Sequence, residues 1–512
     1  MFLYKKMMMK NKIKLVYAFA LTFSLVACSE LDQVDPNQVS ESTFWQTESQ
    51  LDQGVIAAYD VLQFDTMYGQ NLHIIYSGLS DEGTNEHPFE FNALVRFTLS
   101  DTDAFGGPHW GSNYTMISRA YQVLENEPRF NKPAIAGQAE FLIALAYFNL
   151  VGYFGENVAY VDRVQNPGDR PSTAEDGQIY ALIESMLLSA IDKLPLGWSE
   201  NDYGRATKGA AQALLAKTYF QQQRFAEAEP LLKAVIDSGQ YSLLANYADN
   251  FMETGTVNPE AVFLVNFIED GPTNETDSNR RHQIFSVSEQ GGAFGDIQCS
   301  NMIFNAFNRE EDATGSKDSR MDQTIIYPGS ELTYYGLSGQ AWADEAPDQN
   351  LLTGFYKYSE QEHTANNVDP SSGLPTFMTI LADGGTDYIV IRYADVLLMY
   401  AEALNAAGNT AQAVTYVDQV RARSERPALL DAYPGAADSQ SAFRDQLEQE
   451  RILELSGENW RFFDLKRYGK YNNAQQAEDA NFGTFTDGQD EVAGIPQSEL
   501  DTNANLRPNQ AN

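Results

Sequence analysis

The sequence predicts a mainly α protein in which a scaffold of helical hairpins packs against an irregular, loop-rich lobe. Apolar residues recur with helical spacing in two separate regions of the chain. The segment between these regions is rich in Gly, Asn, Asp, Ser and Thr and has no sustained helical period. The 512 residues also exceed the ~250–300 at which a single core stops growing. We therefore expect more than one lobe.

The first helical region covers the N-terminal half. Helical spacing of apolar residues predicts helices within 114–124, 141–152 and 179–190, followed by a pair at 207–222 and 225–237. Each helix has one apolar stripe, which it can bury only against a neighbour. Pro230 lies inside the second helix of the pair, so we expect a kink there or a later helix start.

The second helical region repeats this hairpin pattern at 389–407 and 411–423, with Gly408-Asn409 as the turn between the helices. Large and small apolar residues alternate across both hairpins, which is typical of tetratricopeptide-like packing with a period of about 34 residues. Repeats of this kind usually follow one another directly. Here more than 140 residues separate the two clearest hairpins.

The intervening segment, residues 240–388, is expected to form long loops with short elements, including a buried strand at 261–268. It is also rich in aromatic residues, most of which should belong to a core. They are Phe285, Phe294, Phe304, Phe307, Tyr327, Tyr334, Tyr335, Trp342, Phe355, Tyr356 and Tyr358.

The N-terminus has the features of a bacterial lipoprotein export signal. Five lysines precede a 13-residue apolar stretch, 15–27, which ends in the small residue Ala27 directly before Cys28. That stretch is too short to span a bilayer and has the length of a signal peptide. We expect cleavage before Cys28 and a lipid on its thiol, with several acyl chains for stable attachment.

Composition excludes several classes of function. The net charge is −37, and becomes −42 without the five signal lysines, so nucleic acid is not an expected partner. Cys299 is the only cysteine beyond Cys28, which excludes an intrachain disulfide and a cysteine-rich zinc site. No two of the five histidines have helical ligand spacing, and no phosphate-binding loop or G-x-S-x-G motif is present. The sequence predicts no metal and no cofactor.

Ordered motifs resemble those of the SusD/RagB family over nearly the whole mature chain. The N-terminal half contains Phe44-Trp45, then Trp110 with Tyr114, and the helix 139–148 followed by Phe154-Gly155. The C-terminal half contains the runs 391–405, 420–423, 450–455, 461–467 and 495–500. Two positions differ from the family pattern: Asn459 stands where a glycine is common after Glu458, and 506–510 replaces the usual Asn-Pro-Gly-Tyr ending.

The resemblance implies an outer-membrane lipoprotein that faces the cell exterior and is not an enzyme. Such a protein captures extracellular oligosaccharide and passes it to a SusC-like TonB-dependent transporter. The implied organisation is a signal peptide at 1–27, an N-terminal helical region at 28–239, a ligand-binding lobe at 240–388 and a C-terminal helical region at 389–512.

A sugar ring has an apolar C–H face and a rim of hydroxyls, so a binding site needs exposed aromatic rings and a few polar side chains. Two loops have this composition, although a solvated turn and a packed loop are the plain alternatives. The predicted ligand contacts are Asp81, Glu82, Asn85, Phe89 and Arg96 from the first loop and Tyr334, Tyr335 and Trp342 from the second. The acidic chain favours a neutral sugar, unless a basic patch near Arg96 or Arg280-Arg281 acts locally.

Other interpretations remain open at the level of sequence. The chain could be a RagB-like protein that captures peptides for a peptide importer, a glycan-degrading enzyme with two carboxylates in a cleft, or a plain helical scaffold. Charged residues near the C-terminus are better explained as a buried ion-pair network than as a catalytic set. They are Glu450, Arg451, Glu454, Arg461, Asp464 and Arg467.

Overall fold

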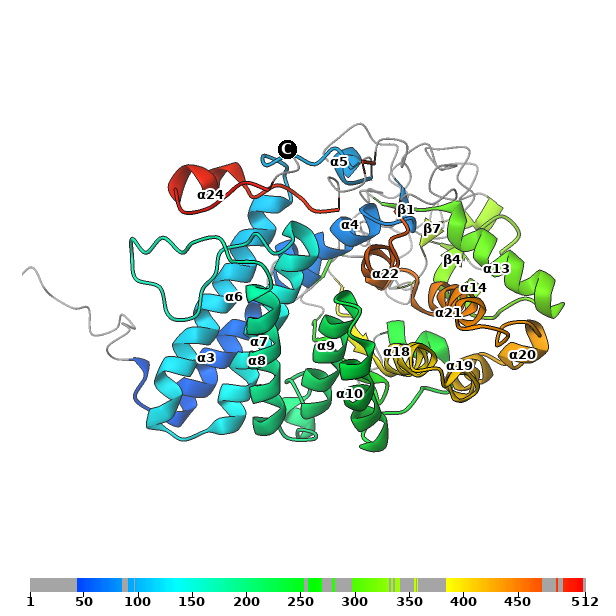
Figure 1. The fold of residues 1–512 in the computed structure, drawn as a ribbon, viewed down its shortest axis with the longest axis horizontal. Coiled ribbons are helices and arrows are strands. Elements are labelled where there is room, and N and C mark those ends of the chain that lie inside the picture. Colours follow the sequence, from blue (N-terminus) through cyan, green and yellow to red (C-terminus); the bar gives the residue numbers. More distant parts are fainter. Residues whose placement is uncertain are drawn as a thin grey trace, which may run out of the picture. The chain divides into compact units, whose positions relative to one another are not determined.

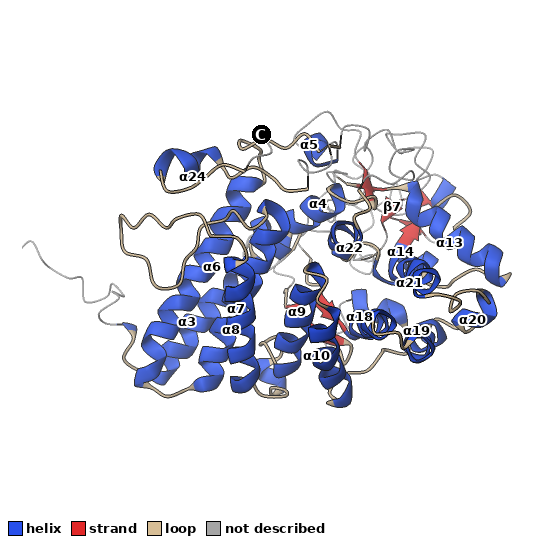
Figure 2. Ribbon diagram, in the orientation of Figure 1, coloured by secondary structure: helices blue, strands red, loops and turns tan. Residues whose placement is uncertain are grey.

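The computed structural model describes a chain dominated by helices, with short strands (Figure 2). The described residues are 44–84, 91–95, 97–252, 257–268, 279–280, 297–330, 333–334, 337–340, 354–355, 357, 384–471, 485–486 and 491–509. The chain divides into two compact units, residues 1–50 and 51–512. The second unit contains the elements discussed below.

Five long helices form the N-terminal part of the scaffold, as predicted. Each packs against the next one in the chain, and Figure 1 shows them side by side. They are α6 (Gly106–Asn126), α7 (Pro133–Phe154), α8 (Gln178–Lys193), α9 (Lys208–Gln221) and α10 (Phe225–Asp237). Pro230 lies inside α10, which begins at Phe225, so the helix does not start late.

Helix α7 is the central helix of this group. Among the described helices it alone is long and apolar enough to cross a membrane, but 89% of its apolar window is buried in the protein. Apolar side chains surround the helix, including Phe141, Leu145 and Phe148. This pattern is that of a core helix.

The two hairpins that are distant in sequence are neighbours in space. Helix α10 packs against α18 (Tyr393–Ala406), which pairs with α19 (Thr410–Arg423). Strand β2 (Ala261–Val265) follows α10 and pairs antiparallel with β8 (Tyr388–Arg392), which leads directly into α18. The residues between β2 and β8 are thus an insertion into one continuous helical stack.

Strand β8 corrects one prediction. Residues 389–392 were expected to begin a helix, but they belong to a buried strand, and α18 begins at Tyr393. The run Ile389-Val390-Ile391 is β-branched and buried, so it favours a strand once β2 offers a partner. The predicted strand at 261–268 is confirmed as β2, although it ends at Val265.

The lobe also contains a helix that the sequence analysis missed, α13 (Asn301–Thr314). Ser300 caps its N-terminus, since the Ser300 hydroxyl accepts a hydrogen bond from the backbone N–H of Met302 at 3.3 Å. Ile303, Ala306, Phe307 and Glu310 are buried along one face with helical spacing. The helical spacing of apolar residues was present in the sequence, but the charged residue Glu310 interrupts the apolar stripe.

The other described strands of the lobe are only two residues long. They form three antiparallel pairs, β1 with β3, β4 with β7 and β5 with β6. Their bounds are Gly83–Thr84, Gln298–Cys299, Ile325–Ile326, Gly354–Phe355, Thr333–Tyr334 and Leu337–Ser338. Among the lobe aromatics whose side chains the structure describes, Phe307, Tyr327 and Phe355 are buried and Phe304 is half-buried.

The remaining elements surround these two parts. They are α3 (Glu48–Asp60), η1 (Val61–Gln63), η2 (Asp65–Gly69), α4 (Asn71–Gly78), α5 (Phe91–Val95), η3 (Glu127–Arg129), η4 (Glu200–Asp202), η5 (Tyr247–Phe251), α14 (Met321–Thr324), α20 (Leu429–Ala432), α21 (Gln440–Leu455), α22 (Trp460–Tyr468) and α24 (Gln497–Thr502). Helix α21 packs against α18, α19 and α13, and α22 packs against α4 and α9. Helix α21 therefore joins the scaffold to the lobe through α13.

Asn459 explains one departure from the family pattern. Its backbone has a φ of 69°, in the left-handed region that glycine enters freely. Asparagine is the residue that best tolerates this conformation after glycine. The Asn459 amide also donates a hydrogen bond to the Tyr388 hydroxyl at 3.1 Å, so the asparagine keeps the turn and adds a contact.

Candidate functional site

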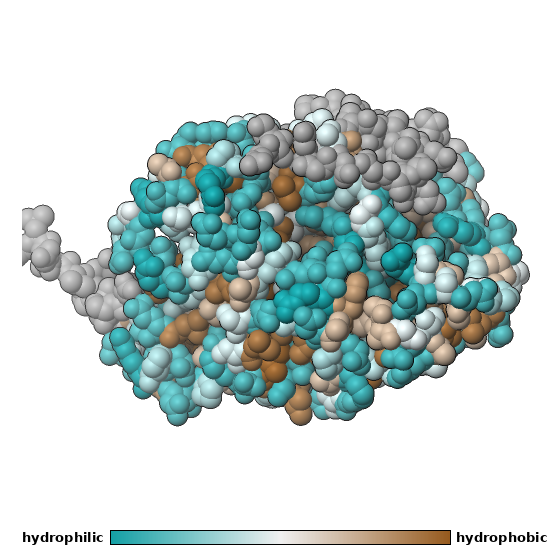
Figure 3. Space-filling view, viewed as in Figure 1, coloured by the Kyte–Doolittle hydropathy of each residue, from teal (hydrophilic) through white to brown (hydrophobic). Residues whose placement is uncertain are grey.

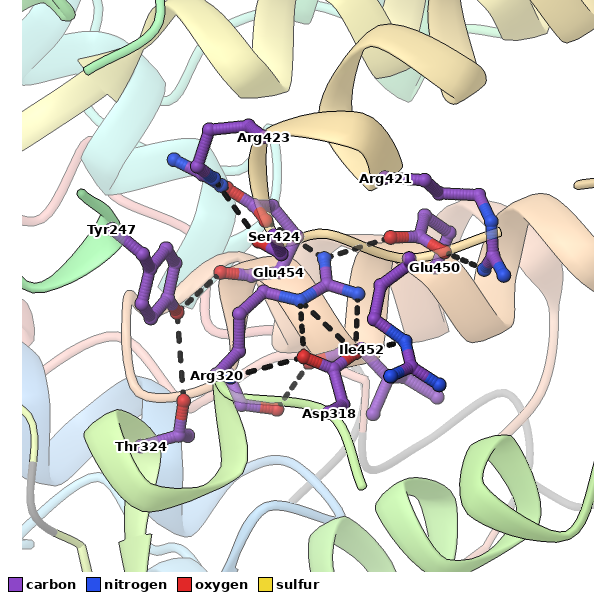
Figure 4. Close-up of polar contacts among 12 residues, drawn as sticks. Tyr247, Asp318, Arg320, Thr324, Arg421, Arg423, Ser424, Glu450, Ile452 and Glu454 are labelled. Carbon is purple, nitrogen blue, oxygen red and sulfur yellow. Dashed lines mark hydrogen bonds and ion pairs between the residues drawn. The ribbon is translucent and has the colours of Figure 1, made fainter. Parts of the chain in front are cut away.

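A buried network of ion pairs lies where the lobe meets α21 (Figure 4). Glu454 of α21 is at its centre. It accepts hydrogen bonds from Arg320 of the lobe at 2.9 Å, from Arg392 of β8 at 2.6 Å and from Arg423 of α19. Burial alone would raise the pKa of Glu454, but Arg423, Arg392 and Arg320 outweigh it and hold that pKa well below its usual range.

The network continues on both sides of Glu454. Arg320 also pairs with Asp318 and with Glu450, at 2.7 Å each, and Arg421 pairs with Glu450 at 2.7 Å. Arg421 further contacts Glu310 of α13 at 2.9 Å. The cluster thus holds together α13, the chain before α14, α19 and α21.

A second cluster lies on the scaffold side. Arg451 of α21 joins Asp395 of α18 and Asp464 of α22, at 2.7 Å each. Lys217 of α9 also pairs with Asp395, and its ammonium lies 3.1 Å from the centre of the Trp460 ring. Trp460 and Trp110 are both buried and contribute to packing.

These contacts confirm the prediction that the C-terminal charges form a buried network. Among the described acids of both clusters, the carboxylates accept hydrogen bonds from guanidinium or ammonium groups, so they are not poised as a catalytic acid and base. The same described residues contain no group of three His, Cys, Asp or Glu side chains able to hold a metal ion.

The first predicted ligand loop begins inside the protein. Asp81 is 9% exposed, and both of its oxygens accept hydrogen bonds from the Arg461 guanidinium at 2.7 Å. Glu82 is 1% exposed and accepts a hydrogen bond from the backbone N–H of Gly457 at 3.3 Å. Two buried carboxylates with these partners do not face a ligand, which argues against the predicted contact role of Asp81 and Glu82. They anchor the loop instead.

Glu82 is unusual among these anchors. Burial raises its pKa to about 7, and the neighbouring Asp81 carboxylate acts in the same direction. The Gly457 N–H and Arg461 oppose this effect only in part. The base of the loop therefore contains a carboxyl group that changes its charge near neutral pH.

Small strand pairs connect the starts of the two predicted loops. Strand β1 follows Glu82 and pairs with β3, β3 contacts β7, and β7 pairs with β4. Strand β4 ends just before Tyr327, and the short β5–β6 hairpin follows it. In Figure 1 the labels β1, β7 and β4 lie near one another, between α5 and α13.

Most of the other predicted site residues are not among the residues that the structure describes. Asn85, Phe89, Arg96, Tyr335, Trp342 and the lipidation residue Cys28 fall outside the described residues. Tyr334 lies in β5, where its backbone is paired with Leu337. Arg280, named as part of a basic patch, forms an ion pair with Asp65 at 3.1 Å.

The structure also shows a cavity that the sequence analysis did not predict. Its volume is about 150 Å³, and it lies between the loop that joins α8 to α9 and strand β2. Four aromatic residues line it: Trp198, Tyr203, Tyr241 and Phe263. The sequence feature that could have indicated this cavity is a tryptophan in a loop, between Gly197 and Gly204.

Comparison with protein families gives two matches that together cover most of the chain. Residues 259–511 match the model of the SusD family. Residues 31–220 match a SusD-like family described as starch-binding and associating with the outer membrane.

Individual relatives agree. SusD-like protein P25 of Formosa agariphila is 27% identical over 500 residues, which cover 90% of each chain. A SusD superfamily protein of Bacteroides vulgatus has the same fold, with a TM-score of 0.78 at 22% identity, over 92% of this chain and 100% of that one.

A laminarin-binding SusD-like protein is also similar, with a TM-score of 0.71 at 24% identity over 91% of this chain and 100% of that one. The described fold is mainly helical, like that of these structures. The two family matches, the full-length relatives and the shared fold lead to one conclusion: this chain belongs to the SusD/RagB family.

Proposed function

We propose that this protein is a cell-surface glycan-binding lipoprotein that captures extracellular oligosaccharide and passes it to a SusC-like TonB-dependent transporter. The observation that carries the proposal is the match of residues 31–220 to a family described as starch-binding and associating with the outer membrane. Similarity to a laminarin-binding protein over 91% of the chain supports the same class of ligand.

The chemistry of the described residues fits binding better than catalysis. Glu454 and Asp395 are paired with arginine and lysine side chains, which hold the pKa of both carboxyl groups below its usual range. A glycosidase needs two carboxyl groups in a cleft, one of them protonated. Glu82 has a raised pKa, but it is 1% exposed and lies beside the anchor Asp81–Arg461, so it does not meet this requirement.

The proposed ligand contacts are Asn85, Phe89 and Arg96 from the first loop and Tyr334, Tyr335 and Trp342 from the second. The buried Asp81–Arg461 pair supports the first loop by fixing the point at which it leaves the core. The network around Arg320 and Glu454 supports the second in the same way, because it fixes the chain before β4. Rigid anchors of this kind reduce the entropy lost when a loop binds a ligand.

We favour a neutral glycan as the ligand. The net charge of −37 disfavours uronic acid or sulfated chains, and the ion pair between Arg280 and Asp65 leaves Arg280 partly neutralised. Two to four stacking and hydrogen-bonding contacts correspond to micromolar to millimolar affinity. Weak binding suits a protein that must release its ligand to a transporter.

Affinity electrophoresis in gels that contain laminarin or starch tests the binding function. The wild type should be retarded by a cognate glucan, and Trp342→Ala should lose most of this retardation with little change in melting temperature. Tyr180→Ala on α8 serves as the control, since its half-buried ring lies in the scaffold. Retention by immobilised peptides without retention by any glycan would overturn the proposal in favour of peptide capture.

The proposed anchor is tested separately. Cys28→Ala should abolish labelling by radioactive palmitate and release the protein from the outer-membrane fraction. Protease treatment of intact cells should degrade the wild-type protein, because we propose that it faces the exterior. Co-purification of a TonB-dependent transporter with the tagged wild type tests the partner, and its absence after mild detergent extraction would argue against the complex.

A further inference from the structure

We propose that the cavity between the α8–α9 loop and β2 is a second saccharide-binding site, which takes one ring of a neutral glycan. The site lies against the helical scaffold and is lined by residues between 196 and 264, whereas the ligand contacts proposed above belong to residues 85–96 and 334–342. Its ligand class rests on the glycan-binding function proposed above, but its location and residues are independent of that function.

The cavity is large enough for one six-membered ring. Its volume is about 150 Å³, and a protein cavity of about this volume accommodates one benzene-sized ring. The lining residues come from the α8–α9 loop, from the chain after α10 and from β2. The residues on which the argument depends are Leu196, Trp198, Tyr203, Arg205, Gln240 and Tyr241.

Three of the four aromatic rings, those of Trp198, Tyr203 and Tyr241, are held in place by their own polar atoms. The Trp198 Nε1–H donates to the Ala206 carbonyl at 2.8 Å, and the hydroxyls of Tyr241 and Thr207 are 2.7 Å apart. The Tyr203 hydroxyl accepts a hydrogen bond from the Asn258 N–H at 3.0 Å. Because these polar atoms are occupied, each ring offers mainly its carbon surface to a ligand, in a position set before binding.

The charged side chains at the cavity are paired within the protein. Arg205 pairs with Asp52 at 2.7 Å and with Asp202 at 3.0 Å, and its guanidinium lies 5.8 Å from the centre of the Trp198 ring. Arg205 and Asp202 are the charged residues among those that line the cavity. The single guanidinium already pairs with two carboxylates, so an anionic ligand would find no free cation there, and the site favours a neutral saccharide over an acidic one.

The rim of the cavity combines apolar and polar groups, as a sugar requires. Leu196 is 54% exposed and Val257 is 49% exposed, which is uncommon for large aliphatic side chains. Gln240 beside them is exposed and can exchange hydrogen bonds with hydroxyl groups through its amide. Brown patches interrupt the teal surface near the lower edge of Figure 3, below α8 and α9.

A site that binds one sugar ring would have low affinity by itself, but it would add to the affinity of the binding site proposed above. A glycan chain that already touches the lobe would reach a second site at high effective concentration, which raises the overall affinity without new contacts. We therefore expect the cavity to matter for long chains more than for short oligosaccharides.

The test uses a variant that fills the cavity without removing any contact. A Cβ atom at Gly197 would meet only the Gln240 side-chain oxygen, at 3.5 Å, so Gly197→Phe should fold normally and occupy the cavity. Trp198→Ala is less suitable, because it removes the bond to Ala206 and the contact with Arg205. Melting temperature and circular dichroism verify folding of the variant.

Binding is measured with the mature protein, using methyl β-glucoside as a one-ring probe and laminarihexaose as an oligosaccharide. Saturation-transfer NMR should show the one-ring probe bound to the wild type and to Trp342→Ala, but at least tenfold more weakly bound to Gly197→Phe. The indole signal of Trp198, assigned with Trp198→Phe and recorded on protein labelled with 5-fluorotryptophan, should shift during titration.

The outcomes separate the two proposals. Equal binding of the probe to the wild type and Gly197→Phe, or an unmoved Trp198 signal, overturns the second site even if Trp342→Ala loses polysaccharide retention. Loss of the probe signal in Gly197→Phe with retention unchanged in Trp342→Ala supports the cavity and contradicts the lobe site. Absence of any saccharide binding overturns both.

Discussion

The helices α6–α10 and the helices α18–α22 are held together by different forces. The first group packs mainly through apolar side chains, such as Phe141, Leu145 and Leu214, although Lys193 of α8 also pairs with Glu140 of α7. In the second group, buried arginines and carboxylates connect α18, α19, α21 and α22 to one another, with Glu454 and Asp464 as central acids. Glu454 also connects α21 to Arg320 of the lobe. The difference shows that apolar stripes are sufficient to stack regular helices, while irregular chain needs directional contacts.

The physical reason lies in the geometry of the two interactions. Apolar burial is proportional to area and has no direction, so it suits two helices with continuous stripes. A guanidinium forms hydrogen bonds in a fixed plane and can hold several segments at once. Arg320 and Arg392 each join segments more than 60 residues apart, and both are almost fully buried.

The largest expected effect comes from breaking the network at its centre. Glu454→Ala removes the carboxylate that Arg320, Arg392 and Arg423 share as a hydrogen-bond acceptor, while the three arginines stay buried. We expect a loss of about 3–5 kcal/mol in the free energy of unfolding, measured by urea denaturation. Asp237→Ala, which removes an exposed ion pair with Lys233, is the matched control and should change stability by less than about 1 kcal/mol.

The scaffold should respond to a cavity in its core by a different mechanism. Leu214→Ala in α9 removes a fully buried side chain, and we expect a loss of about 2–5 kcal/mol. This loss should be the same at pH 5 and pH 8, because no titratable group is involved. A strong pH dependence of the Leu214→Ala effect would contradict the distinction between the two regions.

Glu82 allows the comparison to be sharpened by pH. Its folded-state pKa of about 7 lies above the unfolded value of 4.5, so the folded protein binds more protons between these values. The contribution of Glu82 is therefore most favourable below pH 4.5 and is lost as the pH rises through 7, by up to about 3 kcal/mol. Glu82→Gln should remove this decline.

The measurement is the free energy of unfolding at pH 5, 6, 7 and 8 for the wild type and Glu82→Gln. The variant should gain stability relative to the wild type towards pH 8. If both proteins follow parallel curves, Glu82 is ionised throughout this range and its burial has been compensated.

The smallest expected effect concerns the turn at Asn459. Asn459→Ala places a β-carbon in a left-handed backbone with no side-chain compensation, and it also removes the bond to Tyr388. We expect a loss of about 1–2 kcal/mol. Asn459→Gly should lie within about 1 kcal/mol of the wild type, since glycine enters this conformation without strain. Thermal melts of the three proteins decide between these values.

Much of the fold was predictable because helical periodicity is local. The stripes of α6–α10 and the hairpin α18–α19 can be read from residues that are near one another in the sequence. The β-strand at 388–392 was mistaken for helix because its partner, β2, lies more than 120 residues away. Helix α13 was missed because buried Glu310 interrupts its apolar stripe, and the arginines that pair with Glu310 come from the distant C-terminal region.

The predicted site was less accessible to sequence reasoning. Asp81 and Glu82 are acids in a glycine- and asparagine-containing loop, which is the composition of an exposed turn. Only the pairing of Asp81 with Arg461, 380 residues away, shows that they are anchors. The cavity at Trp198 could not be predicted from the sequence either, because its lining residues come from three separate stretches of the chain.

The amino-acid sequence by itself determined the family, the helical scaffold and the existence of a buried charge network near the C-terminus. All three depend on local spacing or on motifs in order. The tertiary structure decided that the two hairpins lie next to each other, which acidic residues anchor a loop, and where the cavity at Trp198 lies. These features depend on contacts between residues far apart in the chain, and the pairing of a charge or the shape of a cavity arises only when those residues meet.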